Sequence, residues 1–309
     1  MLFRRIVPLT IAAGLVLAIA GAWAAVAPAA GPSICSGKLG TPGLLKGTYP
    51  HGVVVKGACA VKSGKARVIG TLTVTKGSAL AAAYGRHHAS LSVTGDLVVG
   101  NGATVILGCK ANPDGSGFPC LDDPNMKHPT LTSHATVTGN LIENSPLAVI
   151  AHNSAIGGNV KETGGGGGVS CAPPTSGVFA KIMSPVYSDY EDSTVGGNMR
   201  ISAMSSCWLG IARVKIHGSL SLSNNQMGDP DAIEVLSSHV GKNLSCVGNG
   251  HPSPMPPGTQ PVWDSVDTGP MGSIYPRAPQ PNTVGGTRSG QCVSASPPTQ
   301  GGPPGTGAF

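Results

Sequence analysis

One short phrase recurs seven times along the chain and constrains its fold more than any other feature. The phrase is an apolar residue, any residue, Gly, a polar residue and a second apolar residue, as in Val93 to Leu97. Its third position falls at residues 70, 95, 139, 158, 197, 218 and 242, the last of which is Lys in place of Gly. Subtracting successive positions gives gaps of 25, 44, 19, 39, 21 and 24 residues, so the two long gaps are about twice the others. The underlying period of roughly 20–25 residues indicates a solenoid.

The second apolar residue of each phrase usually begins an alternating run, such as Leu72-Thr73-Val74. Side chains two residues apart share one face of a strand, so the pattern predicts strands and not helices. The Gly and the polar residue after it are expected to supply the positive φ of a sharp corner between strands. We therefore predict an all-β fold, a right-handed parallel β-helix whose coils stack about 4.8 Å apart. An antiparallel sandwich is the main alternative, and the fixed corner phrase argues against it.

The two ends of the chain differ in composition from the repeats. Arg4 and Arg5 precede an apolar stretch and two small-residue cleavage sites, which predicts a signal peptide over residues 1–29, or an anchor if it stays uncleaved. The β-helix is expected over residues 30–250, followed by a Pro/Gly-rich tail over 251–309 that Cys292 partly ties back. The protein is thus expected to be secreted, extracellular or cell-wall associated, with membrane contact only through an uncleaved N-terminal segment.

The eight cysteines predict disulfides, because an even number in an exported chain reads first as a disulfide framework. No two have the C-x-x-C spacing of a zinc site, and we expect neither a metal nor a cofactor. Eight cysteines allow 105 pairings. Nearest-neighbour pairing is the arrangement that would fasten each long insertion to the coil: Cys35 with Cys59, Cys109 with Cys120, Cys171 with Cys207, and Cys246 with Cys292.

Residues 110–129 and 164–192 interrupt the repeat and are expected to leave the coil as surface loops, where solenoids often carry function. Asp189, Glu191 and Asp192 lie on the second loop and could hold Ca²⁺ weakly, although we expect solvated turn residues. Trp208, next to a cysteine, is a weak binding candidate that we interpret as a loop cover and not as a sugar platform.

Glu143 and Glu162 are the candidate catalytic residues. They occupy the place where other repeats have Val74, Val99 or Ile201, and they are one coil apart. Stacked side by side, the two carboxyl groups would lie within about 5 Å and could bind a cation or act as acid and base. We expect instead that a strand end turns both outward, because a carboxylate inside an apolar stack costs several kcal/mol without a partner.

The charge balance gives little information about a partner. Charged residues make up 11% of the chain, and losing two arginines with the signal lowers the formal charge from +6 to +4. With no Lys/Arg cluster, this argues against nucleic acid and permits loose attraction to anionic wall polymers. The chain contains no G-x-S-x-G, H-E-x-x-H or P-loop sequence.

The repeat phrase, the segment 240–249 (VGKNLSCVGN) and the segment from Asn282 to Cys292 together resemble a group of exported actinobacterial proteins with right-handed β-helix repeats and no assigned activity. The similarity covers about residues 135–292. The Gly-polar corners are more distantly similar to those of bactofilins, which are polymer-forming β-helices. The resemblance implies a secreted, non-enzymatic β-helix, a scaffold or binding module for cell-wall polysaccharide or a surface protein. The alternative is a carbohydrate-active enzyme, a lyase or hydrolase that uses carboxylates on the β-helix face.

Overall fold

A computed structural model describes residues 31–112, 117–229, 233–254, 261–265 and 280–293. The expected signal peptide and most of the expected tail lie outside these ranges. The chain divides into a unit of residues 1–30 and a unit of residues 31–309, and the described helices and strands all belong to the second unit.

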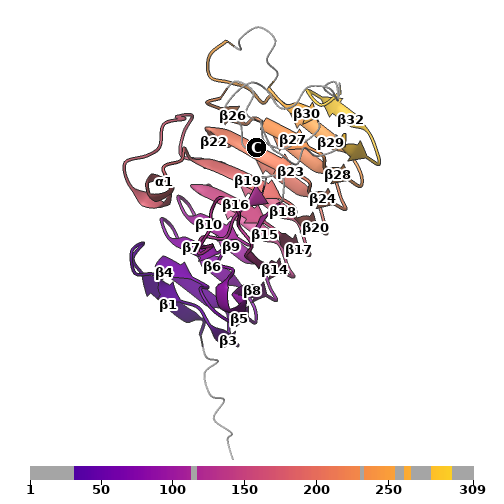
Figure 1. Cartoon of the computed structure of the whole chain (residues 1–309). Coiled ribbons are helices and arrows are strands. Elements are labelled where there is room, and N and C mark those ends of the chain that lie inside the picture. Colours follow the sequence, from indigo (N-terminus) through magenta and orange to yellow (C-terminus); the bar gives the residue numbers. More distant parts are fainter. Residues whose placement is uncertain (1–30, 113–116, 230–232, 255–260, 266–279, 294–309) are drawn as a thin grey trace, which may run out of the picture. The chain divides into compact units, whose positions relative to one another are not determined.

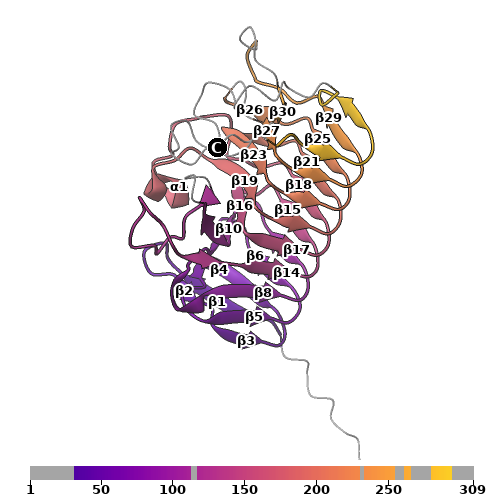
Figure 2. The ribbon, with the colours of Figure 1, turned by 45° about the vertical axis from the view of Figure 1, so that its right-hand side comes forward.

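Three parallel sheets form the faces of a β-helix (Figure 1, Figure 2). The first sheet contains β1 (Ser33–Gly37), β4 (Val53–Ala60), β6 (Leu72–Val74), β9 (Leu97–Val99), β15 (Leu141–Asn144), β18 (Val160–Thr163), β21 (Met199–Ser202), β25 (Leu220–Ser223), β29 (Leu244–Val247) and β32 (Arg288–Gly290). The second contains β2 (Gly43–Leu44), the end of β4, β7 (Ala79–Ala82), β10 (Thr104–Leu107), β16 (Ala148–His152), β19 (Tyr187–Glu191), β23 (Trp208–Ala212), β27 (Ile233–Leu236) and β30 (Trp263–Ser265). The third contains β3 (Gly47–Tyr49), β5 (Lys65–Val68), β8 (Ser90–Val93), β14 (Ala135–Val137), β17 (Ser154–Ile156), β20 (Thr194–Val195), β24 (Lys215–Ile216), β28 (His239–Val240) and β31 (Thr283–Val284). The predicted parallel β-helix is confirmed.

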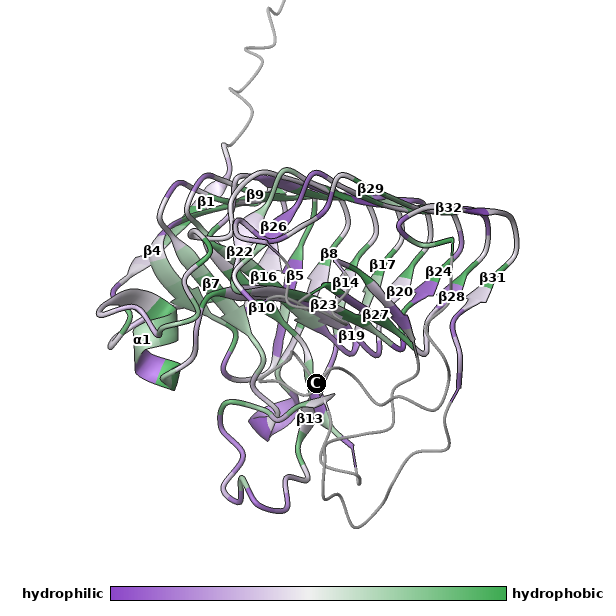
Figure 3. Cartoon of the chain, turned by 90° about the horizontal axis from the view of Figure 1, so that it is seen from above, coloured by the Kyte–Doolittle hydropathy of each residue, from purple (hydrophilic) through white to green (hydrophobic). Residues whose placement is uncertain are grey.

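Equivalent positions of successive repeats stack in register, which builds the core. Leu141 pairs with Leu97 on one side and with Val160 on the other, and all three are buried. The residue between two inward positions points outward, so a single period-2 alternation separates core from surface on each strand. Viewed from above, strands that combine apolar and polar residues surround the interior, and α1 (Gly177–Ile182) lies outside the coil (Figure 3).

The glycine of the repeat phrase serves a different purpose from the one expected. Of the six glycines at that position, only Gly70 has a positive φ, of 96°. At Gly158 a Cβ atom would lie 2.6 Å from Asn140 Oδ1 and 2.8 Å from the Gly139 carbonyl oxygen of the coil below. At five of the six positions glycine is therefore required because the stacked corners approach too closely for a side chain, and there the prediction of positive φ was wrong. At Gly70 the nearest atom would be 3.8 Å away, and the positive φ is the reason for glycine.

The polar residue after that glycine forms a ladder from coil to coil. The backbone N–H of Asn159 donates to Asn140 Oδ1 at 2.9 Å, and the N–H of Asn198 donates to Asn159 Oδ1 at 2.8 Å. Asp96 accepts from Asn140 in the same way. The side chains thus satisfy the backbone donors of the corners, which the strand ladders leave unpaired.

Two insertions and a late coil change the expected boundaries. The first insertion includes the antiparallel strands β11 (Cys109–Ala111), β12 (Gly117–Phe118) and β13 (Thr132–Ser133). The second insertion ends where β19 begins. Residues 187–191 of the expected loop 164–192 therefore belong to the coil, and Asp192 is the corner residue that follows them. The coil also continues past residue 250, where we expected it to end, because β30, β31 and β32 each pair with the strand below. A short pair, β22 (Ser205–Ser206) and β26 (Gln226–Met227), and a 3-10 turn, η1 (Arg86–His88), complete the described elements.

All four predicted disulfides are present, and they leave no free cysteine. Two of them, Cys109–Cys120 and Cys171–Cys207, fasten the insertions, and Cys246–Cys292 joins β29 to the residues directly after β32. Four disulfides indicate an oxidising, extracellular type of environment.

Within the described ranges, we find no helix with the length and apolar character needed to cross a membrane.

Candidate functional site

Glu143 and Glu162 lie inside the β-helix, directly opposite each other on β15 and β18. Neither side chain is exposed to solvent. The Tyr190 hydroxyl lies 2.8 Å from Glu143 Oε2 and 3.0 Å from Glu162 Oε2, and the Ser188 hydroxyl donates to Glu162 Oε1 at 3.2 Å. The expectation that both carboxyl groups face water was therefore wrong: they keep the inward position of the repeat, and a tyrosine from β19 provides the partner that the expectation lacked.

Burial, and then the charge of Glu162, raise the pKa of Glu143 well above its ordinary value. Burial raises the pKa of Glu162 to about 7. Because the two groups are so close, one proton between them removes most of their repulsion, as in other stacked carboxyl pairs. Such a pair could exchange a proton, but a substrate cannot reach it, since both side chains and Tyr190 are enclosed by the core.

A second buried cluster lies on the opposite face of β19. Asp189 and Glu191 alternate with Tyr190 and so point out of the coil, where His152 of β16 is the register partner of Glu191. His152 Nε2 lies 2.8 Å from Asp189 Oδ2, and its Nδ1 lies 3.6 Å from Glu191 Oε2. These three residues are at most 3% exposed, so the expected solvated turn was wrong for Asp189 and Glu191. Phe118 of the first insertion packs on the His152 ring, with ring centroids 5.2 Å apart.

Asp192 and Arg213 stack at the corner beside this cluster. Both have positive φ, 48° and 56°, because they follow β19 and β23 at the same turn of successive coils. Arg213 Nε donates to Asp192 Oδ1 at 2.8 Å, and its Nη2 forms a short contact with Glu191 Oε2. Asn112 of the first insertion also donates to Asp192. The corner thereby holds a three-residue ion-pair network at the edge of the buried cluster.

Burial raises the pKa of Asp189 to about 8. Burial, and then the charge of Asp189, raise the pKa of Glu191 to about 8 as well. Burial lowers the pKa of His152. Burial thus disfavours the charged form of each of these three residues. One imidazole and two carboxyl groups are nevertheless a set of donors that metal ions use.

Trp208 covers the second sheet as a packed side chain. Its ring stacks on Tyr187 at 4.6 Å between centroids, and Tyr187 meets Phe179 of α1 edge-on at 5.5 Å. Trp208 is 8% exposed. It is not available as a stacking platform for a sugar, in agreement with our interpretation of it as a cover.

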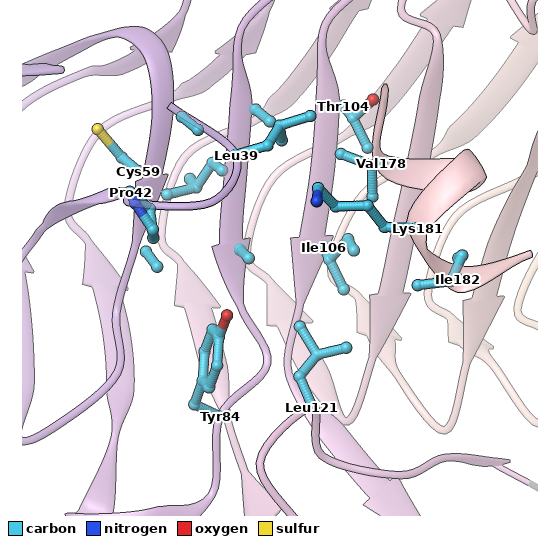
Figure 4. Close-up of a pocket in the computed structure, with 15 residues that line it drawn as sticks. Leu39, Pro42, Cys59, Tyr84, Thr104, Ile106, Leu121, Val178, Lys181 and Ile182 are labelled. Carbon is cyan, nitrogen blue, oxygen red and sulfur yellow. The ribbon is translucent and has the colours of Figure 1, made fainter. Parts of the chain in front are cut away.

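A pocket of about 160 Å³ opens on the outer side of the second sheet, between the segment 39–42 and α1 (Figure 4). Its floor is made mostly of apolar residues of β4, β7 and β10, including Ala58, Ala79 and Ile106. The Tyr84 hydroxyl and the Lys181 ammonium group point toward its centre (Figure 4). No carboxylate lines this pocket, so it can bind a small apolar or anionic group but has no acid–base pair of its own.

No protein-family profile matches the chain, and no curated protein or solved structure is significantly similar to it.

Sequence reasoning did not assign four members of these sites: Tyr190, Ser188, His152 and Arg213. Tyr190 and Ser188 follow the second insertion, where the repeat phrase is interrupted, so their inward positions could not be aligned. The alternation within the segment 187–191 was the available signal, since residues 188 and 190 share one face and residues 187, 189 and 191 share the other.

Proposed function

We propose that this protein is a secreted, non-enzymatic β-helix that binds an anionic cell-wall polymer through its strand faces. The observation that carries the proposal is a separation of charge between the inside and the outside of the folded chain. The four disulfides support an extracellular site of action.

The exposed charged residues of the described chain are cationic. Arg67, Arg86 and Arg200 are exposed, and so is every lysine of the chain: residues 38, 46, 56, 62, 65, 76, 110, 127, 161, 181, 215 and 242. In contrast, each Asp or Glu in the described ranges is buried or half-buried. A formal charge of +6 for the whole sequence therefore understates the positive character of the surface, because several carboxylates that balance the lysines lie inside.

The first and third sheets carry this positive charge on their outer faces. Their strands contribute the exposed residues Lys56, Lys65, Arg67, Lys161, Arg200 and Lys215. The carboxylates on the described strands of these two sheets are Glu143 and Glu162, and both point inward.

Lys161 lies directly opposite Arg200 on adjacent strands of the first sheet. Like charges in opposed positions destabilise a sheet by themselves. A polyanion that crosses both strands would remove this repulsion, because its negative groups can contact both side chains. The arrangement thus favours a polymer over a small neutral ligand.

The same structure gives little support to a carbohydrate-active enzyme. Glycoside hydrolysis ordinarily needs a pair of carboxyl groups that flank the scissile bond and so are open to the substrate. The two groups of converging carboxylates in the described residues, around Tyr190 and around His152, are both enclosed.

One assay distinguishes binding from cleavage. The purified mature protein is incubated with a panel of acidic and neutral polysaccharides, and each mixture is scored for co-sedimentation and for new reducing or unsaturated chain ends. We expect co-sedimentation with acidic polymers and no new chain ends. Cleavage of any polymer would establish the enzyme alternative, and equal binding to acidic and neutral polymers would refute recognition by charge.

A further inference from the structure

The buried cluster on the outer face of the second sheet has the composition and placement of a metal-binding site. Asp189 and Glu191 are two residues apart on β19, so they share one face, and His152 is opposite Glu191 on β16. One ligand atom from each of the three side chains lies within 4.8 Å of the others. Regular strands therefore bring the three donors together, and no loop rearrangement is needed to collect them.

Two atoms of this cluster lack a hydrogen-bond partner. They are His152 Nδ1 and Asp189 Oδ1, and both are buried among the described residues. Asp189 lies beside one nitrogen of the imidazole ring and Glu191 lies beside the other, so each ring nitrogen faces a carboxyl group. A buried polar atom without a partner is uncommon in folded proteins and requires an explanation such as a bound ion.

Carboxyl groups outnumber the cationic side chain beside the cluster. Arg213 contacts Glu191 and Asp192, and Asp189 adds a third carboxyl group, with His152 as its ion-pair partner. A divalent ion at the centre would coordinate the buried carboxylates directly, in place of the water that burial removes.

We propose that His152, Asp189 and Glu191 bind one divalent transition-metal ion of the Zn²⁺ type. One imidazole nitrogen with two carboxylate oxygens is a set of three protein ligands that Zn²⁺ accepts, and the nitrogen ligand disfavours Ca²⁺ and Mg²⁺. One ring nitrogen of His152 would bind the ion. The N–H of the other ring nitrogen would donate to the carboxylate beside it, as ligating histidines usually do. The ion would join β16 to β19 at the place where the second insertion returns to the coil.

Zn²⁺ itself is the probe for this site. Untagged mature protein is stripped with a chelator, and Zn²⁺ is added back in equilibrium dialysis with metal analysis of both compartments. We expect about one bound ion per chain and a thermal midpoint that rises with the free Zn²⁺ concentration. Binding of less than a tenth of an equivalent at 100-fold excess Zn²⁺ over protein would overturn the proposal.

Variants locate the ion. His152→Gln and Asp189→Asn keep side-chain size and should each weaken Zn²⁺ binding by more than the roughly 10–100-fold that an outer-shell partner contributes. His87→Gln is the matched control, since His87 is exposed on the 3-10 turn and outside the cluster; this variant should bind Zn²⁺ like the wild type. Undiminished binding by folded His152→Gln would refute the assignment.

A spectroscopic measurement on the wild type covers the case in which the variants do not fold. X-ray absorption of the Zn²⁺-loaded protein should show a single imidazole with oxygen ligands and no sulfur. Two or more imidazoles would place the ion at surface histidines and would overturn the proposal.

Discussion

Glu143 and Glu162 share the hydroxyl group of Tyr190 inside the β-helix, and no solvent reaches either carboxyl group. A tyrosine hydroxyl has one proton to donate, whereas the pair offers several acceptor oxygens. Two ionised carboxyl groups would place a charge of −2 beside this one donor, so the enclosed pair favours holding at least one proton. This buried pair makes stability depend on pH in a defined direction.

Stability should fall as the pH rises because of Glu162. Its folded pKa of about 7 lies above the ordinary value of 4.5, so between these values the folded chain holds a proton that the unfolded chain has lost. The stabilisation is fully present below pH 4.5 and is lost as the pH approaches and passes 7, at a rate on the order of 1.4 kcal/mol per pH unit. Asp189 and Glu191 act in the same direction up to about pH 8, and His152, whose pKa burial lowers, acts in the opposite direction.

The contribution of Glu162 is measured as the difference in the free energy of unfolding between the wild type and Glu162→Gln. Urea unfolding at several pH values from 5 to 8 gives this difference. The variant should become more stable relative to the wild type as the pH rises. Asp229→Asn, at a half-buried position that does not contact Glu143 or Glu162, is the control and should show no such trend. A wild-type minus variant difference that stays constant across this range would contradict the proton-sharing account.

Tyr190→Phe tests the partner directly. The variant leaves the two carboxyl groups without their principal donor, and we expect a loss of about 1–3 kcal/mol in the free energy of unfolding. Tyr49→Phe is the matched control, because the Tyr49 hydroxyl accepts from the backbone of Lys46 at the surface and should cost less than about 0.5 kcal/mol. Equal losses in the two variants would show that the buried hydroxyl contributes nothing specific.

Gly158→Ala tests why the repeat phrase contains glycine. The new methyl group would meet Asn140 Oδ1 and the Gly139 carbonyl oxygen, so the stacked corner must shift, at a cost of about 1–3 kcal/mol. Gly40→Ala is the control: it has open space around it and an ordinary φ, and should change stability by less than about 0.5 kcal/mol. Thermal or urea unfolding measures both, and a tolerated Gly158→Ala would refute the close-packing explanation.

The sequence predicts the coil well because the relevant signals are local and repeated. The alternation that begins at Leu72 or Leu220 places side chains inside or outside without reference to distant residues. The disulfide pairing is also local, because each pair joins cysteines that are neighbours along the sequence and each insertion contains one cysteine of its pair, Cys120 in the first and Cys171 in the second. The last coil was missed, because Pro-rich segments separate β30 and β31 from the repeats they continue.

The candidate sites depend on contacts that no local pattern contains. Glu143 faces inward because Tyr190, 47 residues later, supplies a hydrogen bond, and the second insertion interrupts the alignment between them. His152 and Glu191 meet only once the register of β16 and β19 is known. The positive surface is likewise invisible in the composition, since net charge counts buried and exposed carboxylates alike.

The most direct test of the account is the salt dependence of binding to an acidic wall polysaccharide by Lys161→Gln/Arg200→Gln and by Lys38→Gln/Lys127→Gln. Each double variant removes two exposed positive charges, but only the first pair lies on opposed strands of the first sheet. We expect wild-type binding to weaken steeply between about 50 and 200 mM salt. At low salt, the first double variant should bind at least about tenfold more weakly than the second, a difference of roughly 1.4 kcal/mol in binding free energy. Binding that does not respond to salt, or that falls equally in the two double variants, would contradict a polymer-binding role for the opposed pair.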